Sequence, residues 1–186
     1  MCIRDRVNTS VNINDRPSAF RYPRGNGQGI ELPSISETLQ IGKGRIILEG
    51  KNLAILNFGA RLDECKKASK ILNKKGIKIT IFDARFAKPL DEKVIIELAS
   101  SHDAIITIEE GSVGGFGSHV TKLLSDRGFF DKGLKFRSMI LPDKFLDQDT
   151  PERMYKTAGL DFESIVEKVE NVLNSNVVIA KNTSLS

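Results

Sequence analysis

The chain has 186 residues, of which 40% are hydrophobic and 28% are charged, and its formal net charge is +4. This composition indicates one globular domain, or one domain with part of another, and excludes a disordered or fibrous chain. The charge excess is small and its signs are interspersed, so it permits an anionic ligand but does not indicate a nucleic-acid partner.

The first 40 residues differ in composition from the rest of the chain. They are rich in Asn, Ser, Gly, Pro and Arg, and their apolar residues are scattered. The glycines in 26–29 predict a loop, and Pro33 interrupts any regular element nearby. Because such a segment would make a poor core alone, we expect a terminus, a linker or the end of a domain that is mostly missing.

From about Gly44 the apolar pattern becomes regular. Short apolar runs at 45–48 and 53–56 predict two strands, and the turn-forming residues between them suggest a hairpin. Helical spacing over 61–75 predicts a helix that Gly76 ends. The pattern then predicts a strand at 77–82, a helix at 91–100, a strand at 104–108, a helix at 114–126, a strand at 136–141 and two helices in 150–174.

Three helix starts carry capping signals. Asp91 and Asp161 each precede a helix, and Thr150 followed by Pro151 has the order of an N-cap and a first helical residue. Strands that alternate with helices predict an α/β fold. We expect a mostly parallel five-stranded sheet with one antiparallel strand and with helices on both faces. Since only 6% of residues are aromatic and Trp is absent, the core should be mostly aliphatic.

The stretch 20–25, Phe-Arg-Tyr-Pro-Arg-Gly, is the first candidate for a binding site. Pro23 favours an extended or polyproline conformation, in which Arg21 and Arg24 can point the same way. Two guanidinium groups beside a glycine can clamp a phosphate or a carboxylate. The alternative is that both arginines are solvated surface residues, as most arginines are.

Residues 107–119 run from a strand through a glycine-rich turn into a helix. Free backbone N–H groups at the start of that helix could hold an anion. The spacing is not that of a dinucleotide-binding fingerprint, and the turn does not belong to the first strand–helix unit. The alternative is a tight turn that packs the helix closely on the sheet, or a turn that forms an interface. The glycines concerned are Gly111, Gly114, Gly115 and Gly117.

Other polar residues do not form a complete catalytic constellation. Glu109 and Glu110 end a strand, but adjacent strand residues point to opposite faces, which disfavours an acid/base pair. His119 could contact Glu109 across the turn, and Asp83 could pair with Arg85 or with a partner. Neither histidine has a partner at metal-ligand spacing, so we assign no catalytic residue and no metal ligand.

The sequence also bears on where the chain works. No apolar run approaches the about 20 residues that span a bilayer, and the first six residues lack the apolar stretch of a signal peptide. Cys2 and Cys65 are too few for a disulfide framework or a metal cluster. We therefore expect no membrane partner and a location in the reducing cytoplasm.

Several blocks resemble the 1-deoxy-D-xylulose-5-phosphate synthase family and occur in that family's order. Residues 15–25 resemble the end of its pyrimidine-binding domain, and the rest resembles its transketolase C-terminal domain, which has three layers. The matching blocks are 15–25, 41–44, 54–59, 83–91, 107–119 and 141–145, within about 7–173. The glycine-rich block is also similar to other members of the transketolase superfamily, including the β subunit of pyruvate dehydrogenase.

The resemblance implies a carboligation with thiamine diphosphate and Mg²⁺ as cofactors. Pyruvate loses CO2 and is joined to glyceraldehyde 3-phosphate, which yields a precursor of isoprenoids, thiamine and pyridoxal; the cofactor carries the chemistry. The resemblance assigns the acceptor phosphate to Arg24, with Arg21 as a second candidate. It also implies a homodimer, and it gives neither histidine a role.

The departures from the family lead to further expectations. The magnesium-diphosphate motif, the activating glutamate and the active-site histidines lie upstream in the family and are absent here. We therefore expect this chain to be inactive alone and to bind neither cofactor. Residues 1–40 should be the tail of a truncated pyrimidine-binding domain with a foreign leader at 1–6, residues 41–176 the transketolase C-terminal-like domain, and residues 177–186 a polar tail. The alternatives are a non-catalytic interaction module of this fold and a β-type subunit of a 2-oxo acid dehydrogenase.

Overall fold

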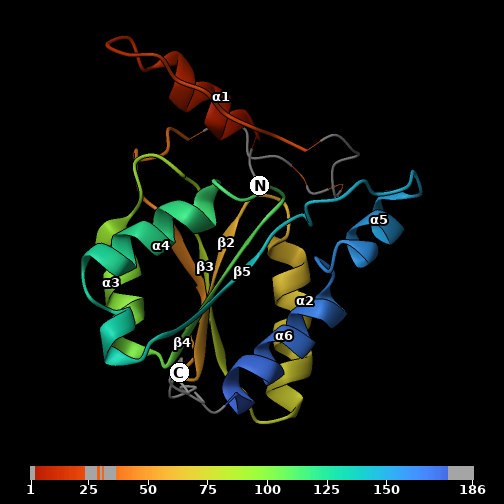
Figure 1. Cartoon of the computed structure of the whole chain (residues 1–186). Coiled ribbons are helices and arrows are strands. Elements are labelled where there is room, and N and C mark those ends of the chain that lie inside the picture. Colours follow the sequence, from red (N-terminus) through yellow and green to blue (C-terminus); the bar gives the residue numbers. More distant parts are fainter. Residues whose placement is uncertain (1–2, 24–28, 30, 32–36, 176–186) are drawn as a thin grey trace, which may run out of the picture.

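A five-stranded sheet lies at the centre of the computed structural model, which describes residues 3–23, 29, 31 and 37–175 (Figure 1). The strand order is β1-β3-β2-β4-β5, with β2 to β5 parallel and β1 antiparallel to β3. This confirms the predicted mixed sheet. The strands are β1 (Arg45–Leu48), β2 (Leu53–Phe58), β3 (Ile79–Asp83), β4 (Ala104–Glu109) and β5 (Lys135–Met139).

The predicted hairpin between the first two strands is wrong. β1 pairs with β3, where Arg45 lies opposite Asp83, and β2 lies on the other side of β3. The reason is burial: β2 is apolar and almost wholly buried, so it takes a central place with parallel neighbours, whereas the more exposed β1 suits an edge. The connection crosses β3 closely at Gly50, where a Cβ would lie 2.4 Å from the carbonyl carbon of Ile79.

Helices cover both faces of the sheet and produce the predicted three layers (Figure 1). One layer contains α2 and α6, which pack against each other, and the other contains α3 and α4. The helices of the domain are α2 (Leu62–Lys74), α3 (Glu92–Ser101), α4 (Phe116–Asp126), α5 (Pro151–Thr157) and α6 (Phe162–Asn174), with the 3-10 turn η1 (Phe130–Lys132).

Each face of the sheet has its own apolar core. Along β2, Leu53 and Ile55 pack in the α2/α6 layer, whereas Ala54 and Leu56 pack in the α3/α4 layer. This alternation is the two-residue period of a strand that is buried on both faces. The core is mostly aliphatic, as the composition predicts, because most of the largest fully buried side chains are Leu and Ile.

Cys65 lies in the buried face of α2 as a free cysteine. Burial raises the pKa of its thiol from 9.0 to about 12. In a Cys2→Ser background we expect no reaction of the native chain with a thiol reagent near pH 8, and full reaction after unfolding, because the thiolate is the reactive form.

The same raised pKa predicts a pH dependence of stability. Since the folded-state pKa lies above the unfolded value, the thiol's contribution is fully present below its ordinary pKa of 9.0 and is lost as the pH rises towards about 12. Urea unfolding across this range should show a shallower loss of stability for Cys65→Ala than for the parent. Parallel pH profiles for the two proteins would contradict the assignment.

All three predicted N-cap residues occupy the N-cap positions of their helices, and two of them also form side-chain caps. The Thr150 side chain accepts from the Arg153 amide, and Pro151 occupies the first turn of α5. Oδ1 of Asp161 accepts from the Ser164 amide at the start of α6, at 3.1 Å. Both caps are local, which is why the spacing of the residues was enough to find them.

Asp91 occupies the N-cap position of α3, as predicted, but it does not cap the helix with its side chain. Its carboxylate makes no capping hydrogen bond. Instead it is buried and accepts from Lys43 Nζ and from the Gly44 amide, both at 3.1 Å. These partners lie in the segment that precedes β1, which is distant in sequence, so the Asp91 carboxylate binds this segment to the start of α3.

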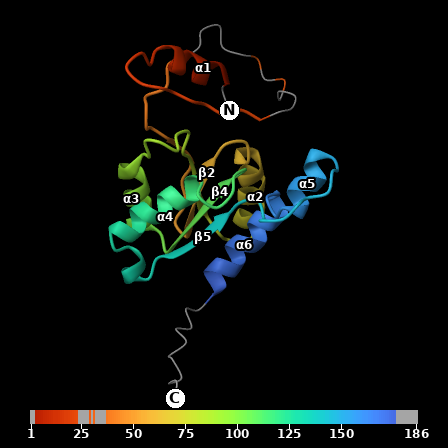
Figure 2. The ribbon, with the colours of Figure 1, turned by 45° about the horizontal axis from the view of Figure 1, so that its top comes forward.

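The N-terminal helix α1 (Ile3–Val11) is not among the predicted elements. It contacts residues far along the chain: the Leu39 amide donates to Thr9 Oγ1, and Arg6 Nη1 donates to the Arg85 carbonyl. Figures 1 and 2 both place α1 beyond the end of the sheet at which the parallel strands finish. The assignments of 1–40 to another domain and of 1–6 to a foreign leader stay predictions, and the predicted polar tail at 177–186 lies outside the described residues.

Candidate functional site

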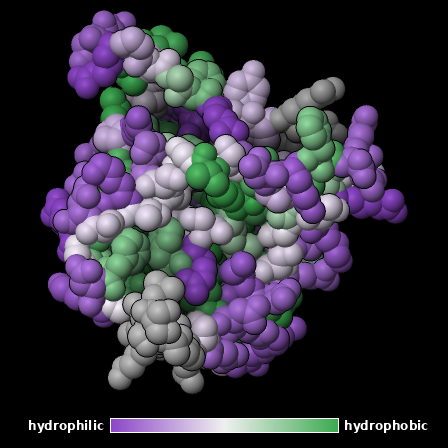
Figure 3. Space-filling view, viewed as in Figure 1, coloured by the Kyte–Doolittle hydropathy of each residue, from purple (hydrophilic) through white to green (hydrophobic). Residues whose placement is uncertain are grey.

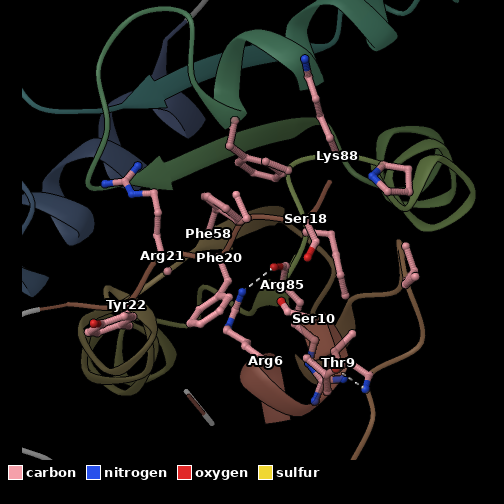
Figure 4. Close-up of a pocket in the computed structure, with 18 of the residues that line it drawn as sticks. Arg6, Thr9, Ser10, Ser18, Phe20, Arg21, Tyr22, Phe58, Arg85 and Lys88 are labelled. Atoms are coloured by element: carbon pink, nitrogen blue, oxygen red, sulfur yellow. Dashed lines mark hydrogen bonds between the residues drawn. The ribbon is translucent and has the colours of Figure 1, made fainter. Parts of the chain in front are cut away.

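The loops that follow the parallel strands enclose a cavity of about 820 Å³ together with the N-terminal segment (Figure 4). Figure 3 shows the hollow on this face, between the N-terminal segment at the top and the body of the domain. Ligands of α/β sheets bind at the carboxyl ends of the strands, so this cavity is the candidate site. Its lining includes Arg6, Ser18, Phe20, Arg21, Phe58, Arg85, Lys88, Glu109, Glu110, Phe116 and His119.

Glu109 ends β4 and is only 3% exposed. Its Oε2 accepts from the Phe116 amide at 3.0 Å, and its Oε1 accepts from the Gly117 amide at 2.8 Å. A carboxylate at a helix N-terminus satisfies amides that have no partner within the helix and interacts favourably with the helix dipole. The chain therefore supplies its own anion at the start of α4. The predicted contact between His119 and Glu109 is not found, because the Phe116 and Gly117 amides bind both oxygens of the Glu109 carboxylate.

Three of the four singled-out glycines allow close packing at this turn. A Cβ at Gly111 would lie 2.6 Å from Glu109 Oε2, and a Cβ at Gly115 would lie 2.5 Å from the same atom. At Gly117 a Cβ would lie 2.7 Å from Thr107 Oγ1, on the sheet beneath. These contacts support the interpretation that the glycines pack the helix start against the sheet.

The turn has no backbone donor to spare for an external anion between Gly114 and Ser118. Besides the two amides bound by Glu109, the Gly114 amide donates to Ser118 Oγ, the Gly115 amide to the Ser112 carbonyl, and the Ser118 amide to the Gly115 carbonyl. Gly114 has a φ of 95°, a conformation that other residues rarely adopt. The role of the turn as an interface stays a prediction.

Glu110 points away from Glu109 and joins separate elements. Its Oε1 lies 2.7 Å from Arg61 Nε, and both side chains are mostly buried. The Arg61 guanidinium stacks 3.5 Å from the centre of the Tyr155 ring, and burial together with the Glu110 carboxylate raises the pKa of Tyr155. Sequence reasoning missed Arg61 and Tyr155, because no local pattern indicates that residues so far apart in the chain meet.

Arg21 lies in the N-terminal segment and reaches the domain. Its Nη2 donates to the Glu110 carbonyl at 3.2 Å, from an exposed position. In Figure 4 its guanidinium points towards the strand ends, away from Ser18 and Arg6. Arg24 lies outside the described residues, so the two-arginine clamp stays a prediction.

The predicted ion pair between Asp83 and Arg85, at the loop after β3, is not found. Asp83 pairs with Arg45, whose Nε lies 3.1 Å from Oδ2. Arg85 has a φ of 58°, which is uncommon for a residue other than glycine. Burial lowers the pKa of Arg85, the nearby Arg45 lowers it further, and the Asp83 carboxylate opposes both. Such backbone conformations occur most often at functional sites.

Within 3–23, 29, 31 and 37–175, no three His, Cys, Asp or Glu residues form a group that could hold a metal ion. In the same part of the chain, no helix has both the length and the apolar character needed to cross a membrane. The expectation that the whole chain binds no cofactor stays a prediction.

A family model and one solved structure bear on the fold. Residues 42–165 match the family model described as transketolase, C-terminal domain, which is more than half of the chain. The chain is similar to a solved structure described as a split gene transketolase, inactive beta4 tetramer: the TM-score is 0.66 and the identity 28%, over 73% of this chain and 44% of that one. It also matches a 2-oxoglutarate:ferredoxin oxidoreductase from Magnetococcus marinus with 2-oxoglutarate, coenzyme A and succinyl-CoA bound, at a TM-score of 0.47 and 14% identity, over 70% of this chain and 20% of that one. The chain thus spans less than half the length of either.

Proposed function

The chain belongs to the transketolase C-terminal domain family, and from this premise we propose that it is the C-terminal part of a thiamine-diphosphate-dependent synthase. The reaction joins pyruvate and glyceraldehyde 3-phosphate to 1-deoxy-D-xylulose 5-phosphate with release of CO2. One observation carries the proposal: the segment that holds the arginine block and the family domain line the same cavity. The hydrogen bond from Arg21 to the Glu110 carbonyl joins the two parts directly.

The described residues do not fit thiamine diphosphate or its Mg²⁺. The amides at the start of α4 that could hold a diphosphate donate their hydrogen bonds to Glu109 instead. Within the described ranges, no three His, Cys, Asp or Glu residues lie together so that they could hold a metal ion. We therefore place the cofactor on residues that another part of the enzyme supplies, and no step of the reaction is assigned to residues of this chain.

Arg24 is the residue proposed to bind the acceptor phosphate, with Arg21 as a second candidate. Arg21 already donates one N–H to Glu110, so it also anchors the segment on the domain. A guanidinium fits a phosphate because its N–H groups form a planar fork. The proposal also includes a homodimer in the cytoplasm.

We expect the purified chain to form no product from pyruvate and glyceraldehyde 3-phosphate, even with added thiamine diphosphate and Mg²⁺. The similar split-gene transketolase is described as an inactive beta4 tetramer, which is a precedent for a chain with this domain that is inactive alone. The measurement is product formation with and without a separately expressed upstream half from the source gene. Product from the chain alone would refute the inactivity.

The complemented enzyme, which is the chain together with the upstream half, also tests the substrate class and the proposed phosphate-binding arginine. Removing a hydrogen bond to a charged group typically costs about 1.5–3 kcal/mol, so Arg24→Gln should raise the KM for glyceraldehyde 3-phosphate by about tenfold or more. Arg153→Gln is the matched control, because Arg153 is exposed, pairs with Asp149 and lies outside the lining of the cavity. Transfer of an acyl group to a lipoyl acceptor, without the sugar phosphate product, would favour the dehydrogenase subunit instead.

A further inference from the structure

The cavity at the strand ends is larger and more apolar than a phosphate clamp for a three-carbon acceptor requires. Its volume of about 820 Å³ lies in the range of pockets that hold drug-sized organic ligands, about 300–1,000 Å³. Phe20 lines it from the N-terminal segment, and Phe58 and Phe116 line it from the domain. The rings of Phe58 and Phe116 stack with their centres 5.2 Å apart. These walls suit a planar apolar group.

The charges that face the cavity favour an anion. Both carboxylates in its lining already have partners within the chain, since Glu109 binds two amides and Glu110 pairs with Arg61. Lys88 lines the cavity at its rim, where Figure 4 shows its side chain extending away from Phe20 and Arg6, and it forms no ion pair or hydrogen bond with another described residue. The lining therefore holds more cationic side chains than carboxylates, and the cationic ones are Arg6, Arg16, Arg21, Arg85 and Lys88.

Polar groups converge inside the cavity as well as at its rim. Figure 4 shows the Arg6 guanidinium beside Phe20, where it donates to the Arg85 carbonyl at 2.9 Å. The Ser10 and Ser18 hydroxyls face the same space in this view. A guanidinium that keeps further N–H groups, together with two hydroxyls, can bind the oxygens of an anionic head group.

We propose that this cavity is a binding site for an organic anion with a planar apolar body. The ring of the ligand lies against Phe20 and Phe58, and its phosphate, carboxylate or sulfonate head group meets the cations of the lining. This site goes beyond the proposed synthase reaction, because the acceptor of that reaction is small and carries no ring. The ligand therefore differs from the substrates in its apolar body.

The test uses the 186-residue chain with anilinonaphthalene sulfonate as the probe, a ring system that carries a sulfonate and fluoresces in apolar surroundings. We expect saturable binding of one probe per chain and a melting temperature that rises with probe concentration. Phe20→Ala and Lys88→Glu should each weaken binding by about tenfold, through loss of a ring contact and reversal of a charge. Phe20 is partly exposed and Lys88 is exposed, so both variants should fold.

Matched controls separate the cavity from binding elsewhere on the surface. Phe145→Ala removes a fully exposed phenyl ring outside the cavity. Lys144→Glu reverses a charge at the neighbouring position, which also lies outside the cavity. Both should bind the probe as the parent does. Equal losses in the control and the cavity variants, or binding that does not saturate, would overturn the proposal.

Competition distinguishes this site from an acceptor site. Phenyl phosphate should displace the probe, whereas inorganic phosphate and glyceraldehyde 3-phosphate at the same concentrations should not. Displacement by glyceraldehyde 3-phosphate would overturn the proposal and make the cavity part of the acceptor site. Failure of the synthase assignment shows instead as absence of product from the complemented enzyme, so the two results can be told apart.

Discussion

Replacing Gly115 by alanine should destabilise the chain by about 2–3 kcal/mol, a typical effect of overpacking a buried site. The new Cβ would lie 2.5 Å from Glu109 Oε2, inside the buried contact between β4 and α4. The backbone itself does not forbid alanine, because the φ of Gly115 is −80°. The clash with the carboxylate is therefore the cause of the expected loss, and urea unfolding measures it.

Removing the Glu109 carboxylate should also lower the free energy of unfolding, but for a different reason. Glu109→Ala leaves the amides of Phe116 and Gly117 without their acceptor at a buried helix start. Unsatisfied buried donors cost about 1–3 kcal/mol each, and the loss of the buried side chain adds to this. We expect a destabilisation of about 3 kcal/mol or more.

The double variant distinguishes the two effects. Once the carboxylate is gone, a Cβ at position 115 no longer clashes, so Glu109→Ala with Gly115→Ala should be less destabilising than the sum by about 1 kcal/mol or more. Ser112→Ala is the control, because Ser112 is exposed in the same turn and its substitution should change stability by no more than about 0.5 kcal/mol. Additive losses would show that the glycine is not required by the carboxylate.

Asp91→Ala should remove the contact between the start of α3 and the segment before β1, which contains Lys43 and Gly44. The buried carboxylate accepts from Lys43 Nζ and from the Gly44 amide. Gly44 has no room to move to another partner, since even a Cβ there would lie 2.2 Å from Phe82 Cζ. We expect a loss of about 2–3 kcal/mol and faster hydrogen exchange at the Gly44 amide, because a charge-assisted bond to a buried carboxylate disappears.

A second variant shows which half of the interaction matters. The Lys43 side chain is 45% exposed, so its ion pair with Asp91 should contribute no more than about 1 kcal/mol. Lys43→Gln should therefore be much milder than Asp91→Ala, and Asp91→Asn should be intermediate because an amide oxygen can still accept from Gly44. Equal losses for Lys43→Gln and Asp91→Ala would assign the stability to the ion pair instead.

Interactions between neighbouring residues explain what could be predicted at the candidate site. The opposite directions of Glu109 and Glu110 follow from the two-residue period of a strand, and the structure shows them with separate partners. The glycines of the turn were found, but their packing around Glu109 was not, because it depends on where α4 lands on the sheet. Arg61 and Tyr155 meet Glu110 only after α2 and α5 are folded against the same edge.

The sequence by itself determined the alternation of strands and helices after Gly44 and the caps at Thr150 and Asp161, because these depend on the spacing of residues that are close together in the chain. It also determined the aliphatic core, which follows from the composition. The blocks within 42–165 also predicted a transketolase C-terminal domain, and the family match over this range confirms that domain. The tertiary structure alone decided that β1 joins β3 rather than β2, and that the Asp91 carboxylate binds the Gly44 amide rather than an amide of α3. It also decided that α1 closes a cavity over the strand ends. These features depend on pairing between distant segments, where burial of a whole strand and satisfaction of a buried carboxylate outweigh the local preferences that a sequence pattern reports.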